Sequence, residues 1–111
     1  MRAVASGMLR MRLEIQEPVE RQLPTGEVVR AWETFDFRWG GVRPLQGREL
    51  VEAQAVTARA THRVSLRGVE IGPRSRLRLG TRVFEILDRV DVEERGRLFE
   101  LTCFETIPPE E

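Results

Sequence analysis

Strict alternation between apolar and polar residues is the feature that most constrains how this chain can fold. From residue 9 to residue 16 every second side chain is apolar, and the positions between are charged or polar. A period of two over eight residues predicts a β-strand with one face in a core and one in solvent. The same period returns at residues 61–67, so the chain is expected to build its core mainly from strands. A last strand is expected at residues 97–106, with Phe99, Leu101 and Cys103 on one face and Leu98 and Phe104 on the other.

The longest strand-like segment, residues 27–43, is rich in aromatic and β-branched residues and predicts a long, bent second strand. Gly40 and Gly41 mark a bulge or kink at which the sheet could curl toward a barrel. Trp32 stands at an even-numbered position, whereas the other aromatic residues of this segment stand at odd-numbered positions. In a regular strand Trp32 would therefore lie on the opposite face, and it lies on theirs only if a bulge intervenes. The aromatic residues expected on one face are Phe35, Phe37 and Trp39.

The segments that separate the strands are rich in proline, glycine and charge, and are predicted as loops. The first is ten residues long, and connections of that length are often used for contact. Residues 77–86 contain Gly80-Thr81 between apolar halves, which predicts a two-residue hairpin turn, with a kinked single strand as the alternative. The predicted loops are residues 17–26, 68–76 and 88–96.

One segment, residues 48–59, has a helical period and follows a turn at residues 44–47. Gly47 can cap its start, and Glu49 suits its first turn. Its apolar stripe is narrow and consists of Leu50, Val51, Ala55 and Ala58. Its other side carries Arg48, Glu49, Glu52 and Arg59, with Val56 among them. Such a helix is expected to lie lightly on a barrel or to meet a neighbouring subunit.

These elements predict a mainly β fold: a small curled-sheet β-barrel of about five to six strands, with one short α-helix between the second and third strands. A chain of 111 residues can bury one core without staples. The barrel domain is assigned to residues 9–106. Residues 1–8 form an N-terminal extension, and residues 107–111 form an acidic flexible tail.

The amino-acid composition argues against several classes of function. The 18 basic and 18 acidic residues cancel, which argues against a dedicated DNA-binding protein. All basic residues are arginine, which is favoured at protein interfaces, although codon bias gives the same pattern. One cysteine and one histidine form neither an internal disulfide nor a usual zinc site, so no metal and no cofactor are expected. The apolar run at residues 3–9 is too short for a signal peptide or a membrane span, so a cytoplasmic protein is expected.

No residues have the pattern of an active site, and the chain is predicted not to be an enzyme. His62 has no evident nucleophile partner and is interpreted as an ordinary strand histidine. Cys103 has apolar and acidic neighbours, so it is interpreted as a buried apolar residue. The acidic cluster that contains Asp91, Glu93 and Glu94 lacks the spacing of a calcium loop and is interpreted as a solvated turn.

An alternating basic row consists of Arg74, Arg76 and Arg78. Such a row could contact phosphates. Because the chain has no net charge, an exposed strand face paired with acids of a neighbouring strand is the favoured interpretation.

Five short motifs give the chain a family resemblance through their order. They are Leu13-Glu14-Ile15-Gln16-Glu17-Pro18, then Gly26-Glu27-Val28 with Trp32, then Val42-Arg43-Pro44-Leu45-Gln46-Gly47-Arg48-Glu49-Leu50, then Ala60-Thr61-His62-Arg63, and last Gly80-Thr81-Arg82-Val83-Phe84-Glu85-Ile86. Each is weak alone, and together they cover roughly residues 9–105. In this order they resemble the tailed-phage head-tail joining family, also called head closure or stopper proteins. Only the extra residues before Leu9 and the acidic tail after Ile107 depart from the pattern.

The resemblance implies a subunit that forms a ring beneath the portal and adaptor, closes the DNA exit channel and docks the tail. Its implied partners are further copies of itself (six or twelve), the adaptor or portal, a tail-terminator or tail tube protein, and the packaged DNA end, with no membrane. Its implied location is the host cytoplasm during assembly and then the virion neck. A phage, a prophage or a gene transfer particle could each be the source.

In that family the segment between the second and third strands projects toward the channel, which corresponds here to residues 44–60. The hypothetical contact or channel-facing residues are Pro44, Leu45, Gln46, Gly47, Arg48, Glu49, Glu52 and Arg59. Two alternatives remain open. One is another connector component, either an adaptor or a tail-terminator, and the other is a small barrel that binds nucleic acid through exposed aromatic residues beside a basic groove.

Overall fold

A computed structural model describes residues 10–68, 71–72, 74–92 and 96–106. The described part contains six strands and one helix, in the order predicted from the sequence. The elements are β1 (Met11–Gln22), β2 (Val28–Pro44), α1 (Gly47–Val56), β3 (His62–Arg67), β4 (Arg76–Leu79), β5 (Arg82–Asp91) and β6 (Leu98–Thr106). The predicted extension and tail lie outside the described residues.

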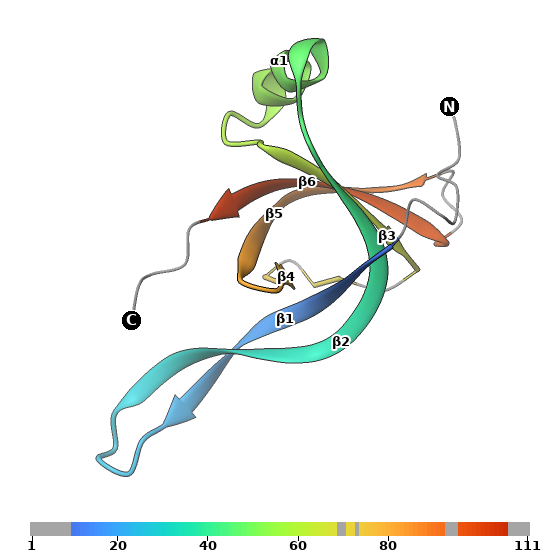
Figure 1. The fold of residues 1–111 in the computed structure, drawn as a ribbon. Coiled ribbons are helices and arrows are strands. Elements are labelled where there is room, and N and C mark those ends of the chain that lie inside the picture. The colour runs from blue at the N-terminus through green and yellow to red at the C-terminus, as the bar shows by residue number, and fades with distance from the viewer. Residues whose placement is uncertain (1–9, 69–70, 73, 93–95, 107–111) are drawn as a thin grey trace.

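The six strands form one antiparallel sheet that closes on itself as a barrel (Figure 1). The strand order around the barrel is β1-β2-β3-β6-β5-β4, and β4 pairs back to β1 through Glu14–Gln16. Closure leaves few unpaired strand edges, which matters for a sheet of short strands. The predicted mainly β barrel with one helix between the second and third strands is therefore confirmed.

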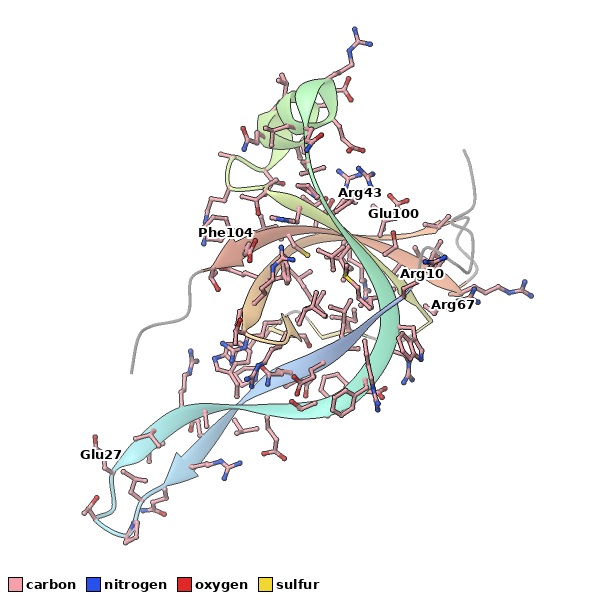
Figure 2. The ribbon with its side chains drawn as sticks, viewed as in Figure 1. Arg10, Glu27, Arg43, Arg67, Glu100 and Phe104 are labelled. Atoms are coloured by element: carbon pink, nitrogen blue, oxygen red, sulfur yellow. The ribbon has the colours of Figure 1, made fainter. Side chains whose placement is uncertain are left out.

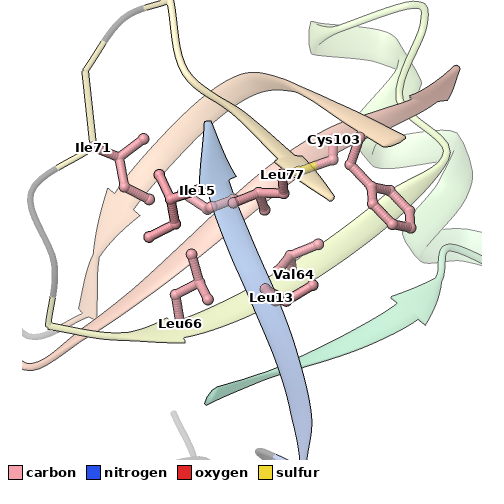
Figure 3. Packing of buried hydrophobic residues seen from close by; sticks show 9 residues of the cluster. Leu13, Ile15, Val64, Leu66, Ile71, Leu77 and Cys103 are labelled. Atoms are coloured by element: carbon pink, nitrogen blue, oxygen red, sulfur yellow. The ribbon is translucent and has the colours of Figure 1, made fainter. Parts of the chain in front are cut away.

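The core fills the centre of this barrel (Figure 3). Period-two alternation places its residues, since the core side chains of β1, β3 and β6 stand at every second position. The positions between them are mostly polar, with Leu98 and Phe104 of β6 as exceptions. Phe84 of β5 is the largest fully buried side chain. The cluster consists of Leu13, Ile15, Val64, Leu66, Ile71, Leu77, Phe84, Leu101 and Cys103.

Tight curvature of β2 depends on Gly40, which is buried where β2 passes from its pairing with β1 to its pairing with β3. A Cβ atom there would lie 2.6 Å from the backbone oxygen of Ser65 and 2.7 Å from Leu13 Cδ1. The bulge itself lies elsewhere, because the β1–β2 register shifts between Ile15 and Gln16 and skips Phe35. This bulge is the one that Trp32 requires in order to lie on the same face of β2 as Phe37 and Trp39.

The predicted loop at residues 17–26 is wrong. β1 continues to Gln22 and pairs with β2 as far as Val28, so only residues 23–27 form the turn. Pro18 suggested a loop because it lacks a backbone N–H. Past Gln16, however, β2 is the only described strand that pairs with β1, and proline is tolerated at an edge of this kind. We call this projecting ladder, residues 17–33, the hairpin arm (Figure 1).

Two smaller boundaries also differ from the prediction. The charged turn expected at residues 88–96 begins later, because a register shift after Ile86 lets β5 continue to Asp91. The helix ends at Val56 and not at residue 59, and its N-cap is Gln46, which makes no side-chain capping bond. The hairpin expected around Gly80-Thr81 is confirmed, since β4 and β5 pair on either side of it and Gly80 has a φ of 61°.

Candidate assembly surfaces

The segment between β2 and β3 projects from one end of the barrel, and we call residues 44–60 the helix arm (Figure 1). No residue of α1 is buried. Val51 and Val56 are 69% and 86% exposed, which is unusual for aliphatic side chains on a short helix. α1 therefore contributes no side chain to the core.

The arm is attached to the barrel at its two ends. Leu45 is buried and its backbone N–H donates to the carbonyl of Thr61 over 2.9 Å. Ala60 is also buried, and its carbonyl accepts from Gln54 Nε2. Arg59 is drawn back onto the barrel by an ion pair with Glu85 at 3.1 Å. These contacts fix the base of the arm.

An ion pair between Arg43 and Glu49 braces the start of the helix. The hydrogen bond from Arg43 holds the pKa of the Glu49 carboxyl below its ordinary value. Arg43 and Glu100 lie close together at this base (Figure 2). Of the eight residues proposed from the sequence, Leu45, Glu49 and Arg59 are therefore engaged within the subunit. The exposed remainder is Pro44, Gln46, Gly47, Arg48 and Glu52.

A second exposed surface lies on β1 and β2, and we call it the aromatic face. It combines four aromatic residues that are 42–57% exposed: Trp32, Phe35, Phe37 and Trp39. Two arginines lie over these rings. The guanidinium of Arg12 is 4.6 Å from the Phe37 centroid, and that of Arg76 is 4.2 Å from the Trp32 centroid. Stacked arginine and aromatic pairs are typical of protein interfaces and of nucleic-acid contacts.

The predicted pairing of the basic row with acids holds only in part. Arg78 lies 3.9 Å from a Glu14 carboxylate oxygen. Arg76 donates from Nε to Gln16 Oε1 at 2.8 Å and meets no carboxylate among the described residues. Gln16 in turn donates to Thr34, whose hydroxyl donates to the Glu14 carboxylate, so Arg76 is linked to a carboxylate only through two neutral side chains. Arg74 precedes β4 and is exposed.

His62 has a carboxylate neighbour that the sequence did not reveal. Its Nε2 lies 3.5 Å from Glu105 Oε1, and its ring packs edge-on against Phe84 at 5.3 Å. Arg82 donates two hydrogen bonds to Glu105, which lowers the pKa of that carboxyl. Thr61 Oγ1 lies 2.9 Å from His62 Nδ1 but also accepts the Glu105 backbone N–H, so it is not a free nucleophile. The cluster links β3, β5 and β6.

This cluster predicts a pH effect on stability. Burial, more than the charge of Arg82, lowers the pKa of His62, while Glu105 acts in the opposite direction. As the pH falls, His62 is therefore protonated in the unfolded chain at a higher pH than in the folded protein. The folded state loses stability as the pH falls below about 6.5, the ordinary pKa of histidine. We expect the urea midpoint of the wild type to fall between about pH 7.5 and pH 5.5, and that of His62→Gln to fall less. An equal fall in both proteins would contradict this, because Glu49 and Glu105, with lowered pKa values, titrate below this range.

The remaining candidate for chemistry is buried. Cys103 is fully inaccessible, and burial raises its pKa to about 12, so its thiol stays protonated and packs as an apolar residue. Among the described residues no group of three histidine, cysteine, aspartate or glutamate side chains could hold a metal ion. No helix in the described part of the chain has the length and apolarity needed to cross a membrane.

Solved structures that share this fold include the following two. The solution structure of protein SF1141 from Shigella flexneri 2a is 29% identical, with a TM-score of 0.72 over 92% of this chain and 96% of that one. A chain of the virion of a native gene transfer agent particle is 18% identical, with a TM-score of 0.56 over 90% of this chain and 97% of that one. No match is found among curated proteins.

A family model agrees with the resemblance found in the motifs. The model of the phage head completion protein family matches residues 4–106, which include all six strands and both arms. That match extends over more of the chain than the five motifs do. The chain therefore belongs to the phage head completion protein family.

Proposed function

We propose that this protein is a head-tail connector subunit, a stopper, that forms a ring beneath the portal and adaptor. In this role the ring seals the DNA exit channel after packaging and provides the docking surface for the tail. Subunits would assemble in the host cytoplasm and remain in the virion neck. Membership of the phage head completion protein family already makes the chain a structural protein of the virion.

The observation that carries the proposal is the helix arm. It is attached firmly at its base by Leu45 and Ala60, yet its helix has no buried residue. A short helix with no buried residue is marginal in water and gains stability from a partner surface. A ring built from identical head-to-tail contacts supplies such a surface to every copy.

Charges on the arm suit a contact between subunits. Arg48 and Glu52 are exposed, and no ion pair joins either of them to another described residue. The groove between α1 and the barrel has a cavity volume of about 280 Å³ and includes Glu52, Val56 and Asp88 in its lining. We propose that a neighbouring subunit or the adaptor contacts this groove and the exposed residues of the arm.

Double charge reversal, Arg48→Glu with Glu52→Arg, tests the proposed contact. We expect the variant to keep its melting temperature, because both side chains are exposed, and to lose ring assembly. Sedimentation velocity and electron microscopy of the purified protein measure the assembly. The matched control is the reversal Arg21→Glu with Glu33→Arg in the hairpin arm, which exchanges one exposed ion pair. If the variant with both charges reversed forms rings at the same protein concentration as the wild type, the proposed contact is excluded.

The role in the virion is tested with particles from a strain that lacks the gene. The connector proposal predicts heads without tails, many of them emptied of DNA, in electron micrographs. Normal, filled and tailed particles would refute it. Tails with aberrant ends on filled heads would favour a tail-terminator role instead.

A second candidate, nucleic-acid binding, is favoured by one observation. Trp32 lies beside Arg30, Arg74 and Arg76 in a groove, the combination of stacking surface and cations used by single-strand binders. Binding of a labelled oligonucleotide should then weaken steeply as salt rises. Absence of binding at low salt would remove this candidate.

A further inference from the structure

A groove of the described barrel lies between the hairpin arm and the strand ends of β4, β5 and β6. Its cavity volume is about 500 Å³. The walls include Pro18, Val83 and Ile86 as apolar residues. Trp32 and three arginines, Arg30, Arg74 and Arg76, also line it. These residues are far apart in sequence and come together only when the barrel closes.

Positive charge in this groove is not neutralised by the described residues. Arg30, Arg74 and Arg76 have no carboxylate within 4.0 Å in that part of the chain, whereas Arg21, Arg38, Arg43, Arg59, Arg63, Arg78 and Arg82 each have one. Glu85 also lines the groove but is already paired with Arg59. Partial burial and the nearby Arg78 lower the pKa of Arg76, as expected for a cation without a counter-ion. The groove therefore favours an anionic occupant.

The chain supplies such an occupant at the groove itself. Thr106, the last residue of β6, lines the groove. The sequence continues with Ile107, two prolines, and then Glu110 and Glu111. Five residues reach up to about 17 Å, more than the width of a groove of this volume. Two carboxylates match the uncompensated arginines, and consecutive prolines lower the entropy lost on binding.

We propose that this groove binds the acidic segment 107–111 of the same chain. The carboxylates of Glu110 and Glu111 form charge-assisted hydrogen bonds with the groove arginines, and the segment covers the ring of Trp32. A subunit that is not assembled thereby keeps part of its aromatic face covered. The proposal concerns the isolated chain and does not depend on the ring or on any role in the neck.

The test uses the full-length chain with Trp39→Phe, so that Trp32 is the only tryptophan. Acrylamide, a neutral quencher, reports the exposure of Trp32 without responding to the charge of the groove. We expect Glu110→Gln with Glu111→Gln to increase the quenching constant about twofold. About 0.5 M NaCl should raise the constant of the unaltered tail to the same value, because screening weakens exposed ion pairs. The matched control, Glu49→Gln with Glu52→Gln, removes two acids that line the separate groove beside α1 and should leave quenching unchanged.

A second measurement uses a peptide with the sequence of residues 105–111. Added to the Glu110→Gln, Glu111→Gln chain, it should restore protection of Trp32, while the peptide with both glutamates changed to glutamine should not. Equal quenching in the wild-type tail and the doubly substituted tail would overturn the proposal. Protection that grows with protein concentration would also overturn it, since the tail would then bind a second copy. Protection by an oligonucleotide but not by the peptide would assign the groove to nucleic acid.

Discussion

Replacement of Phe84 by alanine should lower the free energy of unfolding by about 3–5 kcal/mol, the range for an aromatic residue removed from a core. Phe84 is fully buried and is the largest such side chain in the described barrel. It belongs to one core cluster with residues of β1, β3, β4 and β6, and the ring of His62 packs edge-on against it. The cavity would lie at the centre of a closed barrel, where the strands have little freedom to collapse into it.

Urea denaturation followed by tryptophan fluorescence measures this change. Val90→Ala on the same strand serves as the control, because Val90 is 54% exposed and its truncation should cost under about 0.5 kcal/mol. A loss below about 1.5 kcal/mol for Phe84→Ala would mean that the barrel repacks around the missing ring.

Substitution of Gly40 by alanine should cost about 1–3 kcal/mol, although it adds a single methyl group. That methyl group would lie 2.6 Å from the backbone oxygen of Ser65 and 2.8 Å from Leu66 Cδ2. A side chain can rotate away, but a backbone oxygen in a paired strand can move only if the β2–β3 ladder moves with it. The clash therefore has to be relieved by separating two strands of the barrel.

Thermal denaturation of Gly40→Ala tests this, with Val28→Ala at the exposed start of β2 as the control. Because the closest contact is with backbone, a second substitution that shortens Leu13 should not restore stability. Full rescue by Leu13→Val would show that side-chain crowding, and not strand separation, accounts for the loss.

The barrel could be predicted because each core strand obeys a short-range rule. Leu13 and Ile15 in β1, and Val64 and Leu66 in β3, alternate with polar residues, and the structure buries all four. The extension of β1 past Pro18 could not be predicted, because proline excludes a central strand and permits an edge strand. Only the pairing of β1 with β2 and β4 decides between them.

The candidate assembly surfaces were predictable where they are continuous in sequence. The helix arm is one segment with a weak apolar stripe, so its exposure follows from the sequence alone. The groove beside Trp32 is different, since Arg30 and Arg76 come from strands that meet only through β1. The neighbours of His62 were missed for the same reason, because Glu105 is 43 positions away in the chain (105 − 62).

β2 has a geometric consequence for any assembly that uses both arms. This single strand of 17 residues begins in the hairpin arm, passes through the barrel wall and ends at the helix arm (Figure 1). At about 3.3 Å per residue its contour is roughly 56 Å. Because β2 also curves where it passes from β1 to β3 at Gly40, its length and this bend together determine where the two projecting ends lie. Insertion of one residue into β2 would turn the side chains beyond it to the opposite face of the sheet, and so change which of them each arm presents.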